Sequence, residues 1–232
     1  METTALACLG NIFVDPKKAL QDILPHGRWA WYPLIIAIVV SIAFTAWYFS
    51  TVDMGWLSQQ MLAQSTTKLS TDQQQAALSM MTRGRFLTFG VLGSSLGLVI
   101  ILLLQALYLF FVAKIAGYEP QSYGKWLSFS IWTAFPNVLA TVAAAVTYLF
   151  ANAQTSYYTV DITSLNTLLL HLPLSHPMAG VAASVHLTTF WCLALMIVGL
   201  SLWAKKSLGK SAVIVLAPWV VIYALWIIVK LA

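Results

Sequence analysis

The sequence predicts an all-α, polytopic membrane protein, a helical bundle of five transmembrane helices preceded by a short interfacial N-terminal helix. The first observation is composition: 60% of the 232 residues are hydrophobic and 8% are charged, whereas soluble domains carry about 25% charged residues. The second is length, because five apolar runs approach or exceed the roughly 20 residues that a helix needs to cross a bilayer. The third is the aromatic residues near the ends of these runs, which favour the membrane interface.

The predicted spans follow one another along most of the chain. The first 31 residues form an N-terminal segment, and residues 32–232 form a single transmembrane domain with a hydrophilic loop at residues 51–85. The second span is longer than one crossing requires, which predicts a tilted helix. We expect the five spans at residues 32–49, 86–115, 126–150, 178–203 and 212–232.

The basic residues predict the orientation of the chain. With the N-terminus inside, eight of them fall on the cytoplasmic side and four outside. Cytoplasmic loops carry an excess of lysine and arginine, so we expect a cytoplasmic N-terminus and an extracytoplasmic C-terminus. The inner group is Lys17, Lys18, Arg28, Lys114, Lys125, Lys205, Lys206 and Lys210, and the outer group is Lys68, Arg83, Arg85 and Lys230.

Two short helices are expected outside the spans. Asp15 followed by Pro16 is typical of an N-cap with proline at the first helical position. The helix that follows, to Leu24, has one apolar face, so it either lies in the cytoplasmic interface or packs on the bundle. In the loop, Ser70 and Gln73 have the spacing of a capping box, which predicts a small extracytoplasmic helix.

The ionisable residues argue against several kinds of activity. All seven acids lie outside the predicted spans, which disfavours an ion pump or a proton-coupled carrier and offers no carboxylate pair for acid–base catalysis. Two cysteines, Cys8 and Cys192, cannot form a four-ligand zinc site by themselves, and the spacing of the histidines and Cys192 matches no ligand pattern, so we expect no metal. With no acid, base or nucleophile pair in view, we also expect no catalytic residue and no cofactor. The basic residues form no block, so no nucleic-acid partner is expected.

Small and polar residues inside the spans offer two further candidates. Gly93 and Gly97 form a Gly-x-x-x-Gly pair with Gly90 one turn earlier, and such a stripe lets another span or a second copy of the chain approach closely. The other candidate is a polar seam between the third and fourth spans, with Pro136 as a hinge. Its side chains either line a substrate cavity or make interhelical hydrogen bonds, typically worth about 0.6 kcal/mol each. The seam residues are Ser130, Thr133, Asn137, His186 and Thr189.

Several local patterns, in order along the chain, resemble bacterial members of the Yip (Ypt-interacting protein) family. They include an N-terminal entry, a short loop helix, a mid-helix proline in the third span and a short basic turn after the fourth. Together they cover nearly the whole sequence. The segments are Asn11–Ala19, Trp31–Leu34, Ser70–Ala76, Gly117–Pro120, Tyr123–Trp132, Ala134–Pro136, Phe190–Leu200 and Lys210–Ala212.

This resemblance implies a five-span protein of a bacterial inner membrane, with its N-terminus in the cytoplasm. We therefore predict a non-enzymatic adaptor or organiser that binds other membrane proteins or lipids, with a homo-oligomer as an alternative partnership. A small transporter, channel or lipid-handling protein that uses the polar seam is the alternative function. The residues expected to make cytoplasmic contacts are Tyr118, Glu119, Lys205, Lys206 and Lys210.

Overall fold

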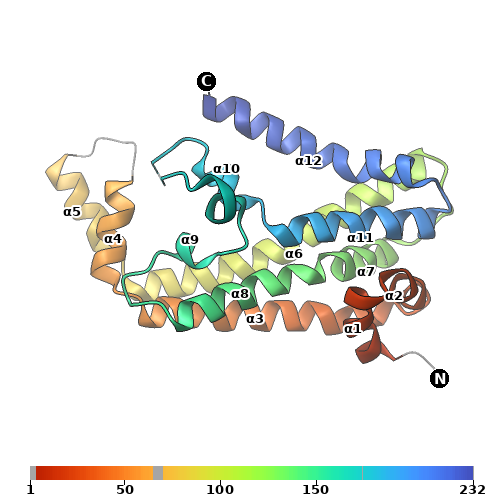
Figure 1. The fold of residues 1–232 in the computed structure, drawn as a ribbon, viewed down its shortest axis with the longest axis horizontal. Helices are drawn as coiled ribbons and strands as arrows, with labels where there is room; N and C mark the ends of the chain where they lie inside the picture. The colour runs from red at the N-terminus through yellow and green to blue at the C-terminus, as the bar shows by residue number, and fades with distance from the viewer. Residues whose placement is uncertain (1–3, 65–69, 174, 232) are drawn as a thin grey trace. The chain divides into compact units, whose positions relative to one another are not determined.

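The computed structural model describes residues 4–64, 70–173 and 175–231, and these residues form an all-helical structure (Figure 1). The predicted fold class is confirmed. Glu2, Lys68 and Ala232, which entered the sequence predictions, lie outside the described residues. The α-helices are α1 (Ala5–Val14), α2 (Pro16–Ile23), α3 (Trp31–Thr51), α4 (Met54–Ala63), α5 (Thr71–Met80), α6 (Arg83–Ile115), α7 (Tyr123–Ala134), α8 (Val138–Leu149), α9 (Tyr157–Val160), α10 (Ala179–Ser184), α11 (Leu187–Ala204) and α12 (Leu208–Leu231).

Five of the described segments are long and apolar enough to cross a membrane: Gly27–Thr51, Arg83–Ile115, Tyr123–Leu149, Leu187–Ala204 and Leu208–Leu231. The fourth begins at Leu187, nine residues after the predicted start at 178, because α10 and an extended segment precede it. In that segment, the backbone N–H of Leu165 donates to the carbonyl of Val185 at 2.7 Å, and that of Leu187 donates to Thr163 at 2.9 Å. These hydrogen bonds to a distant part of the same chain replace helical ones.

The chain divides into two compact units. Unit 1 comprises Met1–Val39, Gly97–Val138 and Thr188–Leu225, and unit 2 comprises Val40–Leu96, Leu139–Leu187 and Trp226–Ala232. Each unit has its own cluster of buried apolar side chains.

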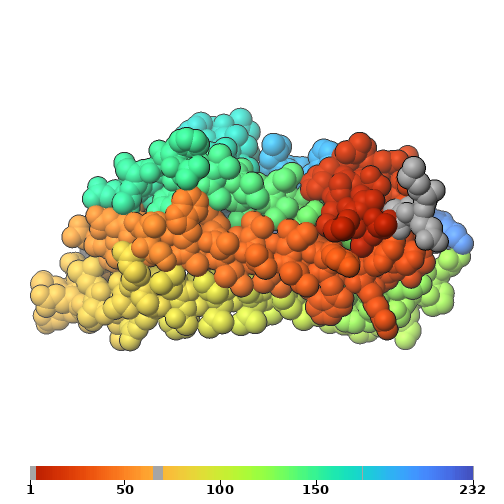
Figure 2. Space-filling model, turned by 90° about the horizontal axis from the view of Figure 1, so that it is seen from below, coloured from red at the N-terminus to blue at the C-terminus, as the bar shows by residue number. Residues whose placement is uncertain are grey.

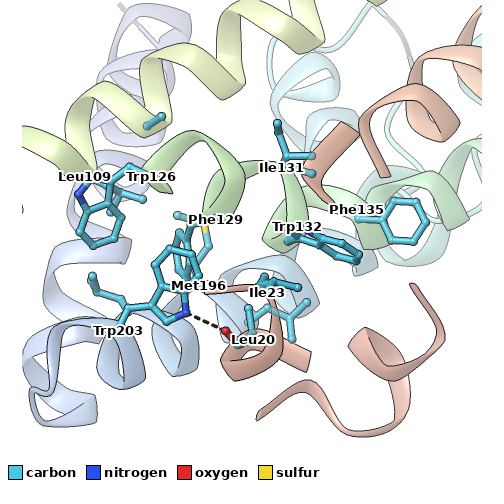
Figure 3. Close-up of a cluster of buried hydrophobic side chains, with 14 of the residues drawn as sticks. Leu20, Ile23, Leu109, Trp126, Phe129, Ile131, Trp132, Phe135, Met196 and Trp203 are labelled. Carbon is cyan, nitrogen blue, oxygen red and sulfur yellow. Dashed lines mark hydrogen bonds between the residues drawn. The ribbon is translucent and has the colours of Figure 1, made fainter. Parts of the chain in front are cut away.

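The core of unit 1 is rich in aromatic side chains (Figure 3). The rings of Phe129 and Trp203 lie 4.9 Å apart, and Trp126 packs against both. Gly199 of α11 contacts this cluster, since a Cβ atom there would collide with the Phe129 ring and lie 3.3 Å from Leu20. The glycine therefore allows α11, α7 and α2 to approach closely.

Helix α2 is part of this core. Its apolar face, formed by Ala19, Leu20 and Ile23, is fully buried, and Asp15 caps its first turn by accepting the backbone N–H of Lys18 at 3.2 Å. Figure 2 shows α1 and α2, coloured red, adjoining the start of α3. The apolar face thus packs on the bundle, as in the second of the two alternatives that the sequence left open.

The last carbonyls of α2 lack intrahelical partners and are satisfied by other groups, as a buried helix end requires. The indole N–H of Trp203 donates to the carbonyl of Leu20 at 2.9 Å. His26 satisfies two more, because its backbone N–H donates to Ile23 at 2.9 Å and its ring Nδ1 lies 3.0 Å from the carbonyl of Asp22. The Trp203 hydrogen bond attaches the N-terminal segment to α11, whereas the His26 contacts lie within that segment.

Unit 2 is held together by tyrosines and by Arg83. The hydroxyl of Tyr48 in α3 donates to the carbonyl of Thr155 at 3.0 Å. The Arg83 guanidinium donates to the carbonyls of Phe49, at 2.6 Å, and Val52, at 3.0 Å, which neutralises the negative end of the α3 dipole. Beyond the span, α5 begins with the predicted capping box between Ser70 and Gln73.

Candidate functional site

The turn after α6 has the geometry that a glycine allows. Gly117 has a φ of 65°, and the backbone N–H of Tyr118 donates to the carbonyl of Ala113 at 2.9 Å. This six-residue hydrogen bond with a left-handed residue inside it is a Schellman motif. It ends the helix sharply and presents Tyr118 and Glu119 side by side.

The turn after α11 has the same geometry but carries a lysine at the left-handed position. Lys205 has a φ of 51°, and the backbone N–H of Lys206 donates to the carbonyl of Ser201 at 3.2 Å. The Ser201 hydroxyl then donates to the carbonyl of Lys206 at 2.7 Å. A side chain in this conformation costs about 1 kcal/mol relative to glycine, so the turn holds Lys205 under local strain.

These two turns meet in unit 1. The Lys205 Nζ lies 2.6 Å from the Glu119 Oε1, and the Lys206 Nζ lies 5.4 Å from the centre of the Tyr118 ring. We call these four residues the turn pair. The side chains of the ion pair are 73% and 52% exposed, and exposed pairs contribute less than about 1 kcal/mol to stability. The turn pair is therefore an accessible, chemically distinctive surface, and Lys210 is exposed in the first turn of α12 nearby in sequence.

Residues of the predicted polar seam are found in both units. Ser130 and Thr133 of α7 and Thr189 of α11 are buried in unit 1. Thr133 donates its hydroxyl to the carbonyl of Phe129, within its own helix, at 2.9 Å. Asn137 is exposed in the same unit. His186 belongs to unit 2, where its ring contacts a residue outside the predicted seam.

That residue is Asp161, which the sequence did not single out. The Nε2 of His186 lies 2.7 Å from the Oδ2 of Asp161, and Thr163 donates its hydroxyl, at 2.8 Å, and its backbone N–H, at 3.2 Å, to the Oδ1. Burial alone would raise the pKa of Asp161, but the hydrogen bond and charge of His186, with those of Thr163, hold this pKa below its usual value. The pair joins the loop after α8 to the start of α11.

A comparison with known families decides the identity of the chain. The family model described as the Yip1 domain matches residues 10–229. The chain belongs to the Yip1 family. Members of this family are generally non-enzymatic membrane proteins, and the turn pair and the Asp161–His186 pair both lie inside the matched region. Neither a curated protein nor a solved structure gives a match.

The three glycines of the predicted stripe and the proline predicted as a hinge differ in how closely other residues of this Yip1-family chain approach them. A Cβ atom on Gly90 would lie 2.7 Å from the Phe49 ring and 3.0 Å from Thr45, so α6 passes close to α3 there. Added Cβ atoms on Gly93 and Gly97 would meet no atom within 4 Å. Pro136 is buried in a short 3-10 turn, residues 135–137, that separates α7 from α8.

The described part of the Yip1 domain brings together no group of three or more histidine, cysteine or acidic side chains that could hold a metal ion. Cys8 and Cys192 are both buried thiols without a disulfide. The turn pair combines a carboxylate, two ammonium groups and a phenol.

Proposed function

We propose that this Yip1-family protein is a non-enzymatic adaptor or organiser of a bacterial inner membrane, and that it binds other membrane proteins or anionic lipids through the turn pair and Lys210. The observation that carries the proposal is the contact between two turns that lie 86 residues apart in the sequence. Their ion pair adds little to stability, and Lys205 occupies a position where glycine fits better. Recognition of a partner gives a reason for a lysine there.

The distribution of basic residues supports a cytoplasmic location for the turn pair. Five consecutive crossings put the N-terminal helices and the turns after α6 and α11 on one side of the membrane. The eight basic residues predicted on the cytoplasmic side all belong to unit 1, whereas Arg83, Arg85 and Lys230 belong to unit 2. An excess of basic residues marks the cytoplasmic side, where each also gains about 1 kcal/mol from anionic lipid near the surface.

Site-specific photo-crosslinking in living cells tests the proposal. Ser122 and Ser207 are unsuitable positions, because their hydroxyls accept the backbone N–H groups that begin α7 and α12. Pro120 and Leu208 are exposed beside the turn pair in sequence and make no such hydrogen bond among the described residues. Discrete partner bands are expected from a photoreactive residue at each of these two positions.

Gln75, exposed on α5, is the matched control, since it belongs to the segment assigned to the opposite side of the membrane. The same partner bands from Gln75 would contradict the assignment of the surface. Only self-crosslinks and lipid adducts from Pro120 and Leu208 would contradict a protein adaptor.

A further inference from the structure

Unit 2 contains a cavity of about 590 Å³, and no residue of the turn pair lines it. Its walls come from the end of α3, from α4, from Phe86 at the start of α6 and from residues 154–159. The Tyr48 hydroxyl holds the last segment by its hydrogen bond to Thr155. Asp53 holds it as well, because its backbone N–H donates to Ala153 at 2.8 Å and its carboxylate accepts from Gln154 at 3.0 Å. The cavity is therefore built by tertiary contacts.

The lining is aromatic and uncharged. Its described residues include no acidic, basic or histidine side chain, and its polar groups are glutamine amides and the hydroxyls of serine, threonines and tyrosines. Burial raises the pKa of Tyr157, and the nearby Asp161 carboxylate raises it further, so this phenol stays neutral at physiological pH. An uncharged lining of this kind favours an uncharged, largely apolar ligand, because no group is present to pair with an ionised one. The aromatic members are Tyr48, Phe49, Trp56, Phe86, Tyr157 and Tyr158.

The location of the cavity identifies the source of such a ligand. Phe49 lies in the last turn of the span Gly27–Thr51, and Phe86 lies in the first turn of the span Arg83–Ile115. Both rings line the cavity and stack with their centres 5.4 Å apart. The ends of these two spans are where the hydrocarbon region of the bilayer is expected to end, so the cavity is expected near that level, where lipid chains are the apolar molecules within reach.

We propose that this cavity binds one hydrocarbon chain of a membrane glycerolipid, with the glutamines Gln60 and Gln64 near its uncharged ester region. Apolar rings and Met61 supply the surface that the chain buries, and the amides supply hydrogen bonds for carbonyl oxygens. This binding site shares no residue with the turn pair, so the lipid-binding proposal and the adaptor proposal can be tested independently.

The test uses the full-length protein in vesicles that contain a phosphatidylcholine with a diazirine near the end of one acyl chain. After illumination, mass spectrometry locates the labelled peptides. Label is expected on residues 56–61 and 154–159, in addition to the lipid-facing surfaces of the spans. Gln60→Trp places a bulky ring in the cavity from an exposed position. If this ring displaces two methylene groups of the bound lipid chain, the affinity for that chain, and with it the labelling of both peptides, should fall by about tenfold.

Gln59→Trp is the matched control, because Gln59 is exposed on the same helix but does not line the cavity. It should leave the labelling of both peptides unchanged. If Gln60→Trp also alters the thermal midpoint, Met61→Lys serves as a second variant, since Met61 is 42% exposed and its lysine would introduce a charge into the lining. The proposal would be overturned if both peptides were labelled as strongly in Gln60→Trp and Met61→Lys as in the wild-type protein. It would also be overturned if the label appeared on the spans alone.

Discussion

The Nε2 of His186 lies 2.7 Å from the Oδ2 of Asp161, and this contact anchors the loop after α8 to the start of α11. Both side chains are largely shielded, at 30% and 19% exposure. A charged hydrogen bond in such surroundings contributes more than an exposed one, and loss of one partner leaves the other without compensation.

Replacement of this acid should lower stability in a pH-dependent way. Asp161→Asn is expected to lower the free energy of unfolding by about 1.5–3 kcal/mol at neutral pH. The folded pKa of Asp161 lies below its ordinary value of 3.8, so its contribution is complete above that value and disappears as the pH falls through the folded pKa. Thermal midpoints in detergent should therefore differ at pH 7 and converge below pH 3.8. A difference that stays constant across that range would contradict the role of ionised Asp161.

The indole hydrogen bond at the end of α2 gives a second prediction. Trp203→Phe keeps most of the ring packing but leaves the Leu20 carbonyl without its donor, which should cost about 1–3 kcal/mol. The N-terminal segment should then become easier to cleave by trypsin at Lys17 and Lys18. Trp191→Phe is the control, because Trp191 is 47% exposed on the same helix. Equal trypsin sensitivity of the two variants would rule out the proposed anchoring.

The glycines of α6 should respond differently to the same substitution. Gly90→Ala forces a methyl group against the Phe49 ring and Thr45 of α3, and overpacking of this kind costs about 1–3 kcal/mol. Gly93→Ala meets no neighbouring atom and should be neutral or stabilising by up to about 1 kcal/mol, since alanine favours helix. Thermal unfolding of the two variants checks this. Destabilisation by Gly93→Ala would indicate that a second copy of the chain packs there.

The strained lysine allows stability and recognition to be separated. Lys205→Gly should raise stability by up to about 1 kcal/mol, because glycine adopts the left-handed conformation without strain. The same variant removes the ion pair with Glu119, and partner crosslinking at Pro120 should decrease. Lys206→Gly is the control for stability, since only the residue at position 205 has a positive φ in that turn. Unchanged crosslinking in a stabilised Lys205→Gly variant would exclude this lysine from partner binding.

The sequence predicted the elements whose signal is local. Apolar runs predicted the spans because burial in lipid requires many consecutive apolar residues. The caps at Asp15 and Ser70 were predicted because a cap involves only neighbouring residues. The start of α11 lies later than predicted because residues 178–186 are apolar enough for a span, whereas the chain is extended at residues 185–186, between α10 and α11. The hydrogen bonds that flank this break are made with residues 163 and 165, which are distant in sequence.

The contacts of the candidate site depend on residues far apart in the sequence. Tyr118 and Glu119, and the lysines after the fourth span, were predicted as separate contact residues, but nothing in the sequence indicated that they meet. The Asp161–His186 pair escaped notice for the same reason, as its members are 25 residues apart. The left-handed conformation of Lys205 was also hidden, because glycine is the residue that usually indicates it.

The hydrogen bond between Trp203 and Leu20 also sets an order for biosynthesis. Its two residues are 183 positions apart, and at about 5–20 residues per second a ribosome needs about 10–40 s to cover that distance. During this interval the apolar face of α2 lacks the part of its docking surface that α11 provides. Completion of the N-terminal region therefore waits for membrane insertion of the fourth span, and a nascent chain arrested earlier would present α2 to chaperones and proteases.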